Sequence, residues 1–295
     1  MTTATTEPTT KTLDVPGATL TYDVRRGTTP AGEPILFLIG SPMGAAGFGT
    51  LAGHFTDRTV MTYDPRGSER SQKTDPTGRS TPDEHADDLH RLIQAVGGGP
   101  VDLFASSGGA VNALALVARH PEQVRTLVAH EPPLASLLPD REHALAVVRA
   151  IHETYQRGGW GAGMAHFIAI TSHEGPFTAE TAGRPAPDPA TFGLPTEDDG
   201  TRTDVMLAQN LITCTHYEPD FDALRAAPTR IVLAAGQQSQ GQLACRGAIA
   251  AAERLGTEPV IFPSHHGGFL GGEYGQAGDP DAFAARLREV LAPRT

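Results

Sequence analysis

The chain has 295 residues, of which 39% are hydrophobic, so it is long enough to bury a full core and to carry an inserted unit. Its 23 Lys and Arg residues stand against 34 Asp and Glu residues, and the net charge of −11 argues against nucleic acid as a partner. No segment approaches the roughly eighteen uncharged apolar residues of a membrane span, and residues 1–11 lack the features of a secretion signal, so we expect a soluble cytoplasmic protein without a membrane partner.

The cysteine content points to a reducing compartment. Cys214 and Cys245 are the only cysteines, and they lie far apart in different predicted elements. Such usage is typical of reduced thiols and not of a disulfide framework, so we expect both thiols to be free.

Short apolar runs in the first part of the chain predict the strands of a parallel sheet. Residues 1–11 are Thr-rich and without periodicity, which predicts a disordered tail, and residues 12–27 read as two strands around a turn at Pro16 and Gly17. Continuous apolar runs too short for helices predict buried strands at residues 34–40, 59–64, 101–105 and 124–129.

Helical periodicity fills the gaps between these strands. Helices are predicted at residues 46–55, 82–96 and 108–119. In the second of them, Leu89, Leu92 and Ile93 mark one apolar face, and Thr81 with Glu84 forms a capping box. Strands that alternate with helices predict right-handed crossovers and helices on both faces of the sheet, which is an α/β fold.

The alternation is interrupted after Glu131. From residue 132 to about residue 228 the patterns are helical, with one helix expected to be capped by Asp140 and another to start at Thr201 and Asp204. A Pro- and Gly-rich stretch between them fits no regular element. We therefore expect a first core part at 12–131, a helical cap at 132–228 and a second core part at 229–293. The second part is predicted to hold strands at 230–235 and 259–262 and helices at 243–255 and 280–291.

A serine stands where an apolar strand passes directly into a helix. The segment Ala105-Ser106-Ser107-Gly108-Gly109 resembles the G-x-S-x-G nucleophile elbow. Such a turn holds its serine on strained backbone and needs small neighbours, which Ala105 and Gly109 supply. Ser107 is therefore the predicted nucleophile, and the N–H of Gly108 would face a developing oxyanion. The alternative is a Ser-Gly loop that only caps the helix.

Nearly the whole chain resembles the α/β-hydrolase superfamily, which implies a mostly parallel eight-stranded sheet, helices on both faces and an inserted helical cap. Residues 63–71 look like the family's Asp-x-Arg-Gly-x-Gly-x-Ser loop, with Glu69 in place of the second Gly, and the role of that loop is structural. Residues 39–43 take the place of the family's His-Gly-x-Pro turn, so the resemblance makes Ser41 the second oxyanion donor. If the register slips, the donor is Met43, because Pro42 has no N–H.

The candidate base lies in a late loop. His265 and His266 follow the last predicted strand and precede the last predicted helix. The resemblance to the family's Gly-x-His-x-Gly-Phe segment points to His266 and leaves His265 as the alternative. Either histidine could also be a solvated loop residue without a function.

The candidate acid follows the strand next to the nucleophile's strand. In much of the superfamily the acid follows the later strand predicted at 230–235, but no carboxylate stands there before Gly241. A triad needs an acid to orient its base, and Glu131 lies at the carboxyl edge of the sheet, where ligand chemistry gathers. The zearalenone lactone hydrolases are similar in the elbow and in a His-Glu-x-Pro segment, and this resemblance implies that Glu131 is the acid. The alternative is a carboxylate at the hinge of the cap.

Together, Ser107, His266 and Glu131 predict a serine hydrolase that cleaves a carboxylic ester or lactone through an acyl-enzyme. We expect no cofactor and no metal ion, because His130, Cys214 and His216 lie in no zinc-type motif. The apolar residues that could line a substrate pocket, or else only pack the cap on the core, are Met43, Trp160, Met164, Phe167, Ile168 and Met206. Four further histidines are expected to be solvated: His85, His90, His120 and His143.

Two rival functions use the same fold. One is a ligand-binding or rearrangement-guiding protein without net hydrolysis, and the other is a carbon–carbon bond hydrolase or an acyltransferase built on the same triad. The predicted partner is a small-molecule ester or lactone. The oligomeric state, a homodimer included, stays open.

Overall fold

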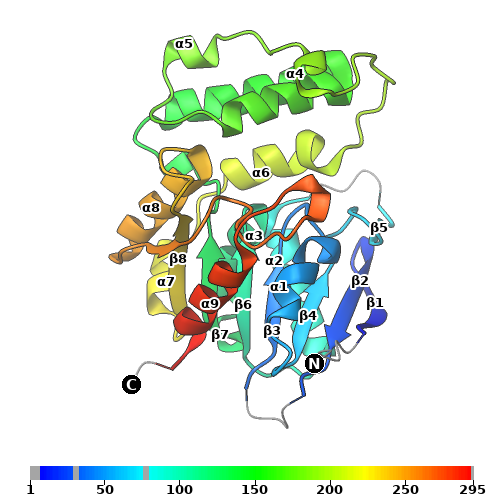
Figure 1. Ribbon diagram of the computed structural model, residues 1–295, viewed down its shortest axis with the longest axis vertical. Coiled ribbons are helices and arrows are strands. Elements are labelled where there is room, and N and C mark those ends of the chain that lie inside the picture. The colour runs from blue at the N-terminus through cyan, green and yellow to red at the C-terminus, as the bar shows by residue number, and fades with distance from the viewer. Residues whose placement is uncertain (1–6, 29–32, 76–79, 294–295) are drawn as a thin grey trace.

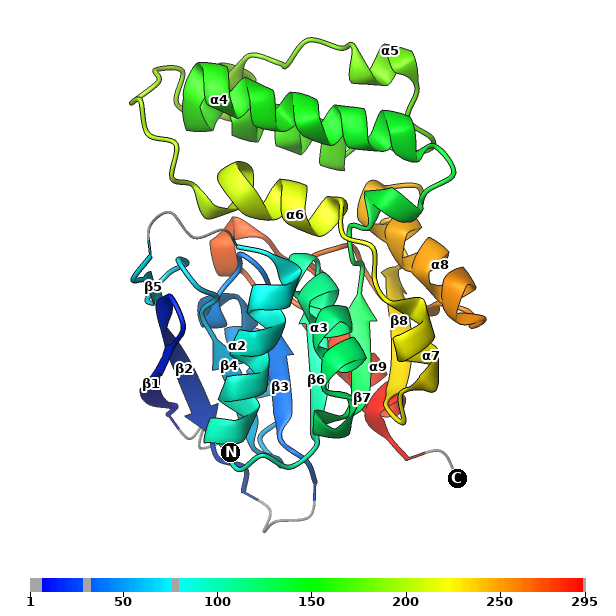
Figure 2. The same ribbon diagram turned by 180° about the vertical axis from the view of Figure 1, so that it is seen from behind.

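The structure is a computed structural model that describes residues 7–28, 33–75 and 80–293. Within these residues one mixed sheet forms the centre of the molecule, with helices on both of its faces (Figures 1 and 2). The strands are β1 (Thr9–Val15), β2 (Ala18–Arg25), β3 (Leu36–Ile39), β4 (Val60–Tyr63), β5 (Gln72–Lys73), β6 (Val101–Ser106), β7 (Val124–His130), β8 (Arg230–Gly236) and β9 (Val260–Phe262).

The sheet is parallel from β4 to β9 and antiparallel at its first edge. Its order is β1-β2-β4-β3-β6-β7-β8-β9, and β5 pairs with β2 beside this path. The described part of the chain therefore has nine strands in this sheet, one more than the eight expected. The reason is that β5 has two residues, too few to produce an alternating pattern.

The α-helices are α1 (Gly49–Gly53), α2 (Pro82–Ala95), α3 (Gly108–Arg119), α4 (Arg141–Thr171), α5 (Ala179–Ala182), α6 (Leu211–Thr215), α7 (Phe221–Ala226), α8 (Leu243–Leu255) and α9 (Pro280–Leu291). Helices α3, α8 and α9 begin and end at the predicted residues, and the capping box of Thr81 and Glu84 is present at the start of α2. The helix predicted at 46–55 is wrong in type for its first turn, which is the 3₁₀ helix Ala45–Phe48 that leads into α1.

Two apolar clusters hold the layers together. One cluster joins the sheet to α2, α3 and α7, and the other joins the opposite face of the sheet to α1 and α9. Strand β3 is buried along its whole length, as its continuous apolar run predicts. Because Phe221 and Leu224 of α7 are buried in the first cluster, α7 is part of the core layers although it precedes β8.

The first strand begins earlier than expected. Residues Thr9–Lys11 pair with β2, and the Thr10 hydroxyl donates to the Asp23 carboxylate at 2.6 Å. The expected disordered tail at 1–11 is therefore wrong for Thr9–Lys11, because backbone pairing at an exposed edge needs no apolar alternation. Residues 1–6 lie outside the described residues.

Helices α4, α5 and α6, which come between β7 and β8, lie above the carboxyl ends of the strands (Figures 1 and 2). We call α4, α5, the π-helix Met206–Asn210 and α6 the insertion. Helix α4 reverses direction at Gly159, which has a φ of +78°, so that its two halves pack side by side and His166 reaches Thr154.

Helix α4 starts directly after Asp140, as predicted, whereas the second predicted helix starts later than Thr201. Asp140 precedes α4, but its carboxylate binds the Phe177 N–H and Arg246 of α8 instead of capping the helix. Asp204 accepts the N–H of Leu207 at 2.7 Å, whereas the Thr201 hydroxyl pairs with Asp199. At Asp140, partners distant in the sequence therefore replace the local capping contact.

The loop after β4 has the structural role expected of it. Asp64 accepts the N–H of Ala45 at 2.8 Å and binds Arg70, and Arg66 forms a buried ion pair with Asp88 of α2. Glu69, which replaces the family's second Gly, has a φ of +50°.

Candidate active site

The candidate nucleophile lies on strained backbone between β6 and α3. Ser107 has φ +58° and ψ −128°, an unusual conformation for a residue with a side chain, and α3 starts at the next residue. Its N–H donates to the His130 carbonyl at 2.9 Å, which ties the turn to β7. The backbone therefore has the form of a nucleophile elbow.

Two glycines allow the turn after β3 to approach this elbow. A Cβ on Gly108 would lie 2.6 Å from the Ser41 carbonyl oxygen, and a Cβ on Gly109 would lie 2.8 Å from the Gly40 backbone. Only glycine fits both positions without a shift of the backbone. This close approach brings Ser41 and Gly108, the two candidate oxyanion donors, beside each other next to Ser107.

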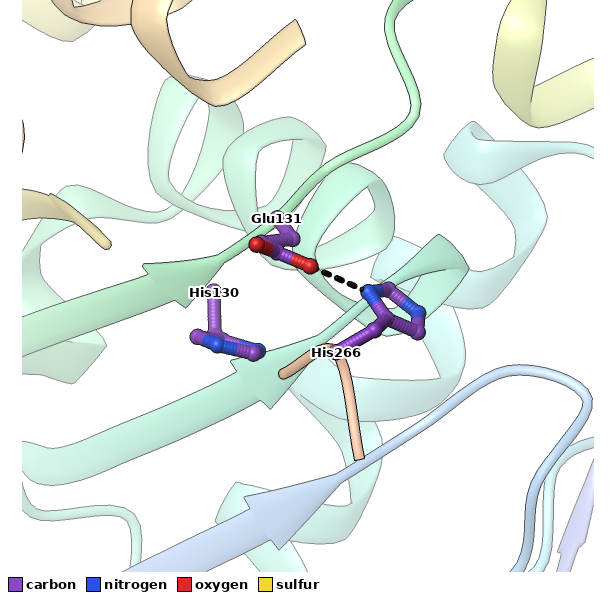
Figure 3. A group of neighbouring side chains, drawn as sticks. All are labelled: His130, Glu131 and His266. Carbon is purple, nitrogen blue, oxygen red and sulfur yellow. Dashed lines mark hydrogen bonds and ion pairs between the residues drawn. The ribbon is translucent and has the colours of Figure 1, made fainter. Parts of the chain in front are cut away.

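The candidate acid and base are in direct contact. His266 Nδ1 lies 2.6 Å from Glu131 Oε2 (Figure 3). The Gly236 N–H donates to the other oxygen, Glu131 Oε1, at 2.7 Å. Both carboxylate oxygens are thus engaged. The Glu131 side chain is fully buried and directly follows β7, whereas His266 is half-exposed and lies in the loop after β9.

These contacts keep the buried carboxylate ionised. Burial alone would raise the pKa of Glu131, but the hydrogen bond from His266, the nearby imidazoles and the Gly236 N–H lower this pKa to about 2. The ionised Glu131 can only accept a hydrogen bond. A neutral His266 must therefore have its proton on Nδ1, the nitrogen that faces Glu131. This tautomer leaves Nε2 free to accept a proton.

His265 does not have such a partner. Its Nδ1 accepts the N–H of Gly267 at 3.1 Å, and its Nε2 lies 3.2 Å from the Ala277 carbonyl. Because the backbone occupies both ring nitrogens, His265 is a poor alternative to His266 as a base.

Ser107 and His266 line one cavity, although no hydrogen bond joins their side chains within the described residues. The two groups are near enough to share the lining of a single space, and catalytic hydrogen bonds often tighten only when substrate is bound. The geometry therefore brings Glu131 and His266 into contact and places Ser107 on the same cavity.

His130 lies beneath the acid and the base. Its ring is fully buried among phenylalanines, and this burial lowers its pKa to about 4, so it is neutral at pH 7. Its Nδ1 lies 3.4 Å from the Ser106 hydroxyl. One potential metal-ligand atom from each of His130, Glu131 and His266 lies within 4.8 Å of the others. Both carboxylate oxygens of Glu131, however, already accept hydrogen bonds from the protein. This donor set therefore fits a hydrogen-bonded pair better than a metal ion.

The cavity lies between the insertion and the ends of the strands and has a volume of about 590 Å³. Four of the predicted apolar residues line it, namely Met164, Phe167, Ile168 and Met206. Trp160 and Met43 are not among the described residues that line it: Trp160 packs within the apolar cluster of the insertion, and Met43 packs over Gly47 and against the core. Lining residues that the sequence did not single out include Ile151, Asn210, Leu211, Cys214, Gln242 and Leu243.

Other side chains with possible chemistry lie apart from the site or are inert. Cys214 and Cys245 are free and buried, and burial raises the pKa of the Cys214 thiol to about 12. The expectation that His85 is solvated is wrong, because its ring faces the core under α2 and is 1% exposed. His85 lies four residues before Leu89 and seven before Leu92, so it falls on the buried apolar face of α2.

Comparisons with known proteins agree with this fold. The sequence model of the α/β-hydrolase fold matches residues 33–158. YraK, an uncharacterized hydrolase of Bacillus subtilis (strain 168), is 32% identical over 263 residues, which span 88% of this chain and 89% of that protein. The chain therefore belongs to the α/β-hydrolase fold family, and the coarser part of the functional prediction, a hydrolase, is supported. The narrower resemblance to zearalenone lactone hydrolases stays a prediction.

Solved structures of low sequence identity share the fold. A thermophilic esterase from Thermogutta terrifontis is 20% identical, with a TM-score of 0.63 over 97% of this chain and 98% of the esterase. The enol-lactonase from Burkholderia xenovorans LB400 is 16% identical, with a TM-score of 0.61 over 95% of this chain and 99% of the lactonase. At these identities the likeness concerns the fold alone. Among the described helices, none has both the length and the apolar character to cross a membrane.

Proposed function

We propose that the protein is a serine hydrolase that cleaves an uncharged carboxylic ester or lactone through an acyl-enzyme. The observation that carries this proposal is the 2.6 Å contact between Glu131 and His266 at the rim of the cavity into which the Ser107 elbow opens. Acid, base and strained serine at one edge of a parallel sheet are the parts that acyl transfer needs.

Each residue has a defined role in this reaction. His266 Nε2 takes the Ser107 proton as Oγ attacks the carbonyl carbon, and the N–H groups of Gly108 and Ser41 receive the oxyanion. Collapse of the tetrahedral intermediate expels the alkoxide, which takes the proton from His266. Water, activated by His266, then hydrolyses the acyl-enzyme. This step releases the carboxylic acid product and returns the proton to Ser107 Oγ. Throughout, the ionised Glu131 stabilises the imidazolium.

The lining of the cavity supports an uncharged, largely apolar acyl group. The insertion contributes aliphatic and aromatic side chains, and no Lys, Arg, Asp or Glu is found among the described residues that line the space. A carboxylate on the substrate would be buried there without a counter-charge, at a high cost in free energy. In this proposal the insertion serves as the cap that excludes water from the reaction.

A fluorophosphonate probe tests the proposal, because it reacts only with an activated serine. The wild type should be labelled at Ser107 and Ser107→Ala should not. Ser106→Ala is the matched control, because Ser106 is the neighbouring serine and its side chain faces His130. Its labelling should persist. An unlabelled wild type would favour the ligand-binding rival, and product analysis with an ester, a lactone and a vinylogous diketone separates hydrolysis of esters from cleavage of carbon–carbon bonds.

A further inference from the structure

One side chain of the insertion is bonded directly to the turn that carries the candidate oxyanion donor. Asn210 is the last residue of the π-helix Met206–Asn210, and its Nδ2 donates to Ser41 Oγ at 3.0 Å. The two residues are 169 positions apart, and they are 3% and 6% exposed. This is therefore a buried contact between the insertion and the core.

The other end of the Asn210 amide has no partner. Its Oδ1 is buried, and no group in the described part of the chain donates to it. A buried acceptor without a donor lowers stability, and a leucine of similar size would avoid that cost. Stability alone therefore does not explain an asparagine here.

The local backbone also marks this position as unusual. The Leu211 N–H donates to the Met206 carbonyl, five residues earlier, in place of the four-residue spacing of an α-helix. Such π-turns are rare, and they occur frequently at functional sites. Asn210 also lines the cavity, together with Ser41, Ser107 and Gly108.

We propose that Asn210 is a positioning residue for the oxyanion hole. By holding the Ser41 hydroxyl, it fixes the turn whose Ser41 N–H receives the oxyanion beside Gly108. The assignment rests on the proposed serine hydrolase function. Because it makes oxyanion stabilisation depend on a residue of the insertion, it also makes catalysis sensitive to how the insertion sits on the core.

A double-mutant cycle tests this role. Asn210→Leu and Ser41→Ala remove the same hydrogen bond from opposite sides, and Ser41→Ala keeps the backbone N–H. Each should lower kcat for p-nitrophenyl butyrate about tenfold, less than the loss of a whole oxyanion donor, and leave KM within about twofold. The double variant should be no slower than either single variant, since both act through one contact.

Thr213→Val is the matched control. The Thr213 hydroxyl in α6 donates to the Ser80 carbonyl at 2.8 Å, so this variant also removes a hydrogen bond between the insertion and the core, but outside the cavity. Its kcat should match that of the wild type. If kcat of Thr213→Val falls as far as that of Asn210→Leu, the loss comes from any weakened contact between the insertion and the core, and the assignment to Asn210 is overturned.

A boronic acid inhibitor gives a second measurement, because its adduct with Ser107 places an oxygen in the oxyanion hole. Its inhibition constant should rise in Asn210→Leu and in Ser41→Ala in proportion to the loss of kcat/KM. Additive losses in the cycle, or an unchanged inhibition constant, would overturn the role of Asn210. If fluorophosphonate still labels Ser107 in that case, the proposed serine hydrolase function stands. An unlabelled wild type would instead overturn the proposed function, and with it this assignment.

Discussion

His266 Nδ1 lies 2.6 Å from Glu131 Oε2, although 135 residues separate the two along the chain. The loop after β9 and the end of β7 bring them together at the carboxyl edge of the sheet. This contact defines the tautomer of the imidazole and therefore the direction in which it can move a proton.

Replacing Glu131 with Gln should leave the fold intact and reduce turnover. The amide cannot stabilise the imidazolium, and its NH₂ group favours the wrong tautomer of His266, so we expect kcat to fall by roughly 10³- to 10⁴-fold. Steady-state kinetics and circular dichroism on the same preparation check both parts. Near-normal turnover would show that Glu131 is not the acid.

The two neighbouring histidines should differ sharply. His266→Gln should abolish measurable turnover, because the replacement has no group that can take the Ser107 proton. His265→Gln should keep activity within about tenfold, since His265 is bonded to the backbone and not to a carboxylate. Equal losses in the two variants would leave the choice of base unsupported.

Lowering the pH should reduce the contribution of Glu131 to the stability of the folded protein. Its pKa is about 2 in the folded protein and 4.5 when unperturbed, so its stabilisation is complete above pH 4.5 and is lost as the pH falls toward 2. At neutral pH the shift corresponds to a stabilisation on the order of 3 kcal/mol. Urea unfolding of wild type and Glu131→Gln from pH 7 to pH 2.5 should show a difference that narrows below pH 4.5. A constant difference would contradict the lowered pKa.

The close packing at the elbow predicts an intolerance of larger residues. Gly109→Ala would place a Cβ 2.8 Å from the Gly40 backbone, so we expect a loss of about 1–3 kcal/mol in the free energy of unfolding and a lower kcat. At Gly53, the last residue of α1, a Cβ would meet no described atom within 4 Å. Gly53→Ala, the matched control, should be neutral or stabilising by up to about 1 kcal/mol. Denaturant unfolding of the two variants compares them directly.

The cavity wall predicts a change in acyl preference. Phe167→Ala removes an aromatic side chain from the lining, and we expect the ratio of kcat/KM for octanoate over acetate esters to fall about tenfold, because the longer chain loses its apolar contacts. Trp160→Phe, at a position that packs inside the insertion, should leave this ratio unchanged. A ratio that is unchanged in Phe167→Ala would place the acyl group elsewhere.

Much of the fold could be predicted from the sequence because buried strands and amphipathic helices have local signatures. The elements α3, α8 and α9 agree to the residue, since each has a clear apolar face and a clear start and end. Strand β5 has no signature in the sequence, because a two-residue strand has no period. Asp140 precedes α4 as predicted, but its carboxylate binds the distant Arg246 and does not cap the helix.

The sequence by itself determined the chemistry that is available: a serine in a small-residue turn after an apolar strand, a carboxylate after the next strand and two histidines in a late loop. These are local facts of composition and order. Only the tertiary structure decided that His266 rather than His265 contacts Glu131, that Met164 and Phe167 but not Trp160 reach the cavity, and that Asn210 bonds to Ser41. The physical reason is that contacts between distant residues depend on how the sheet, the loops and the insertion pack together, and no periodicity along the chain records that packing.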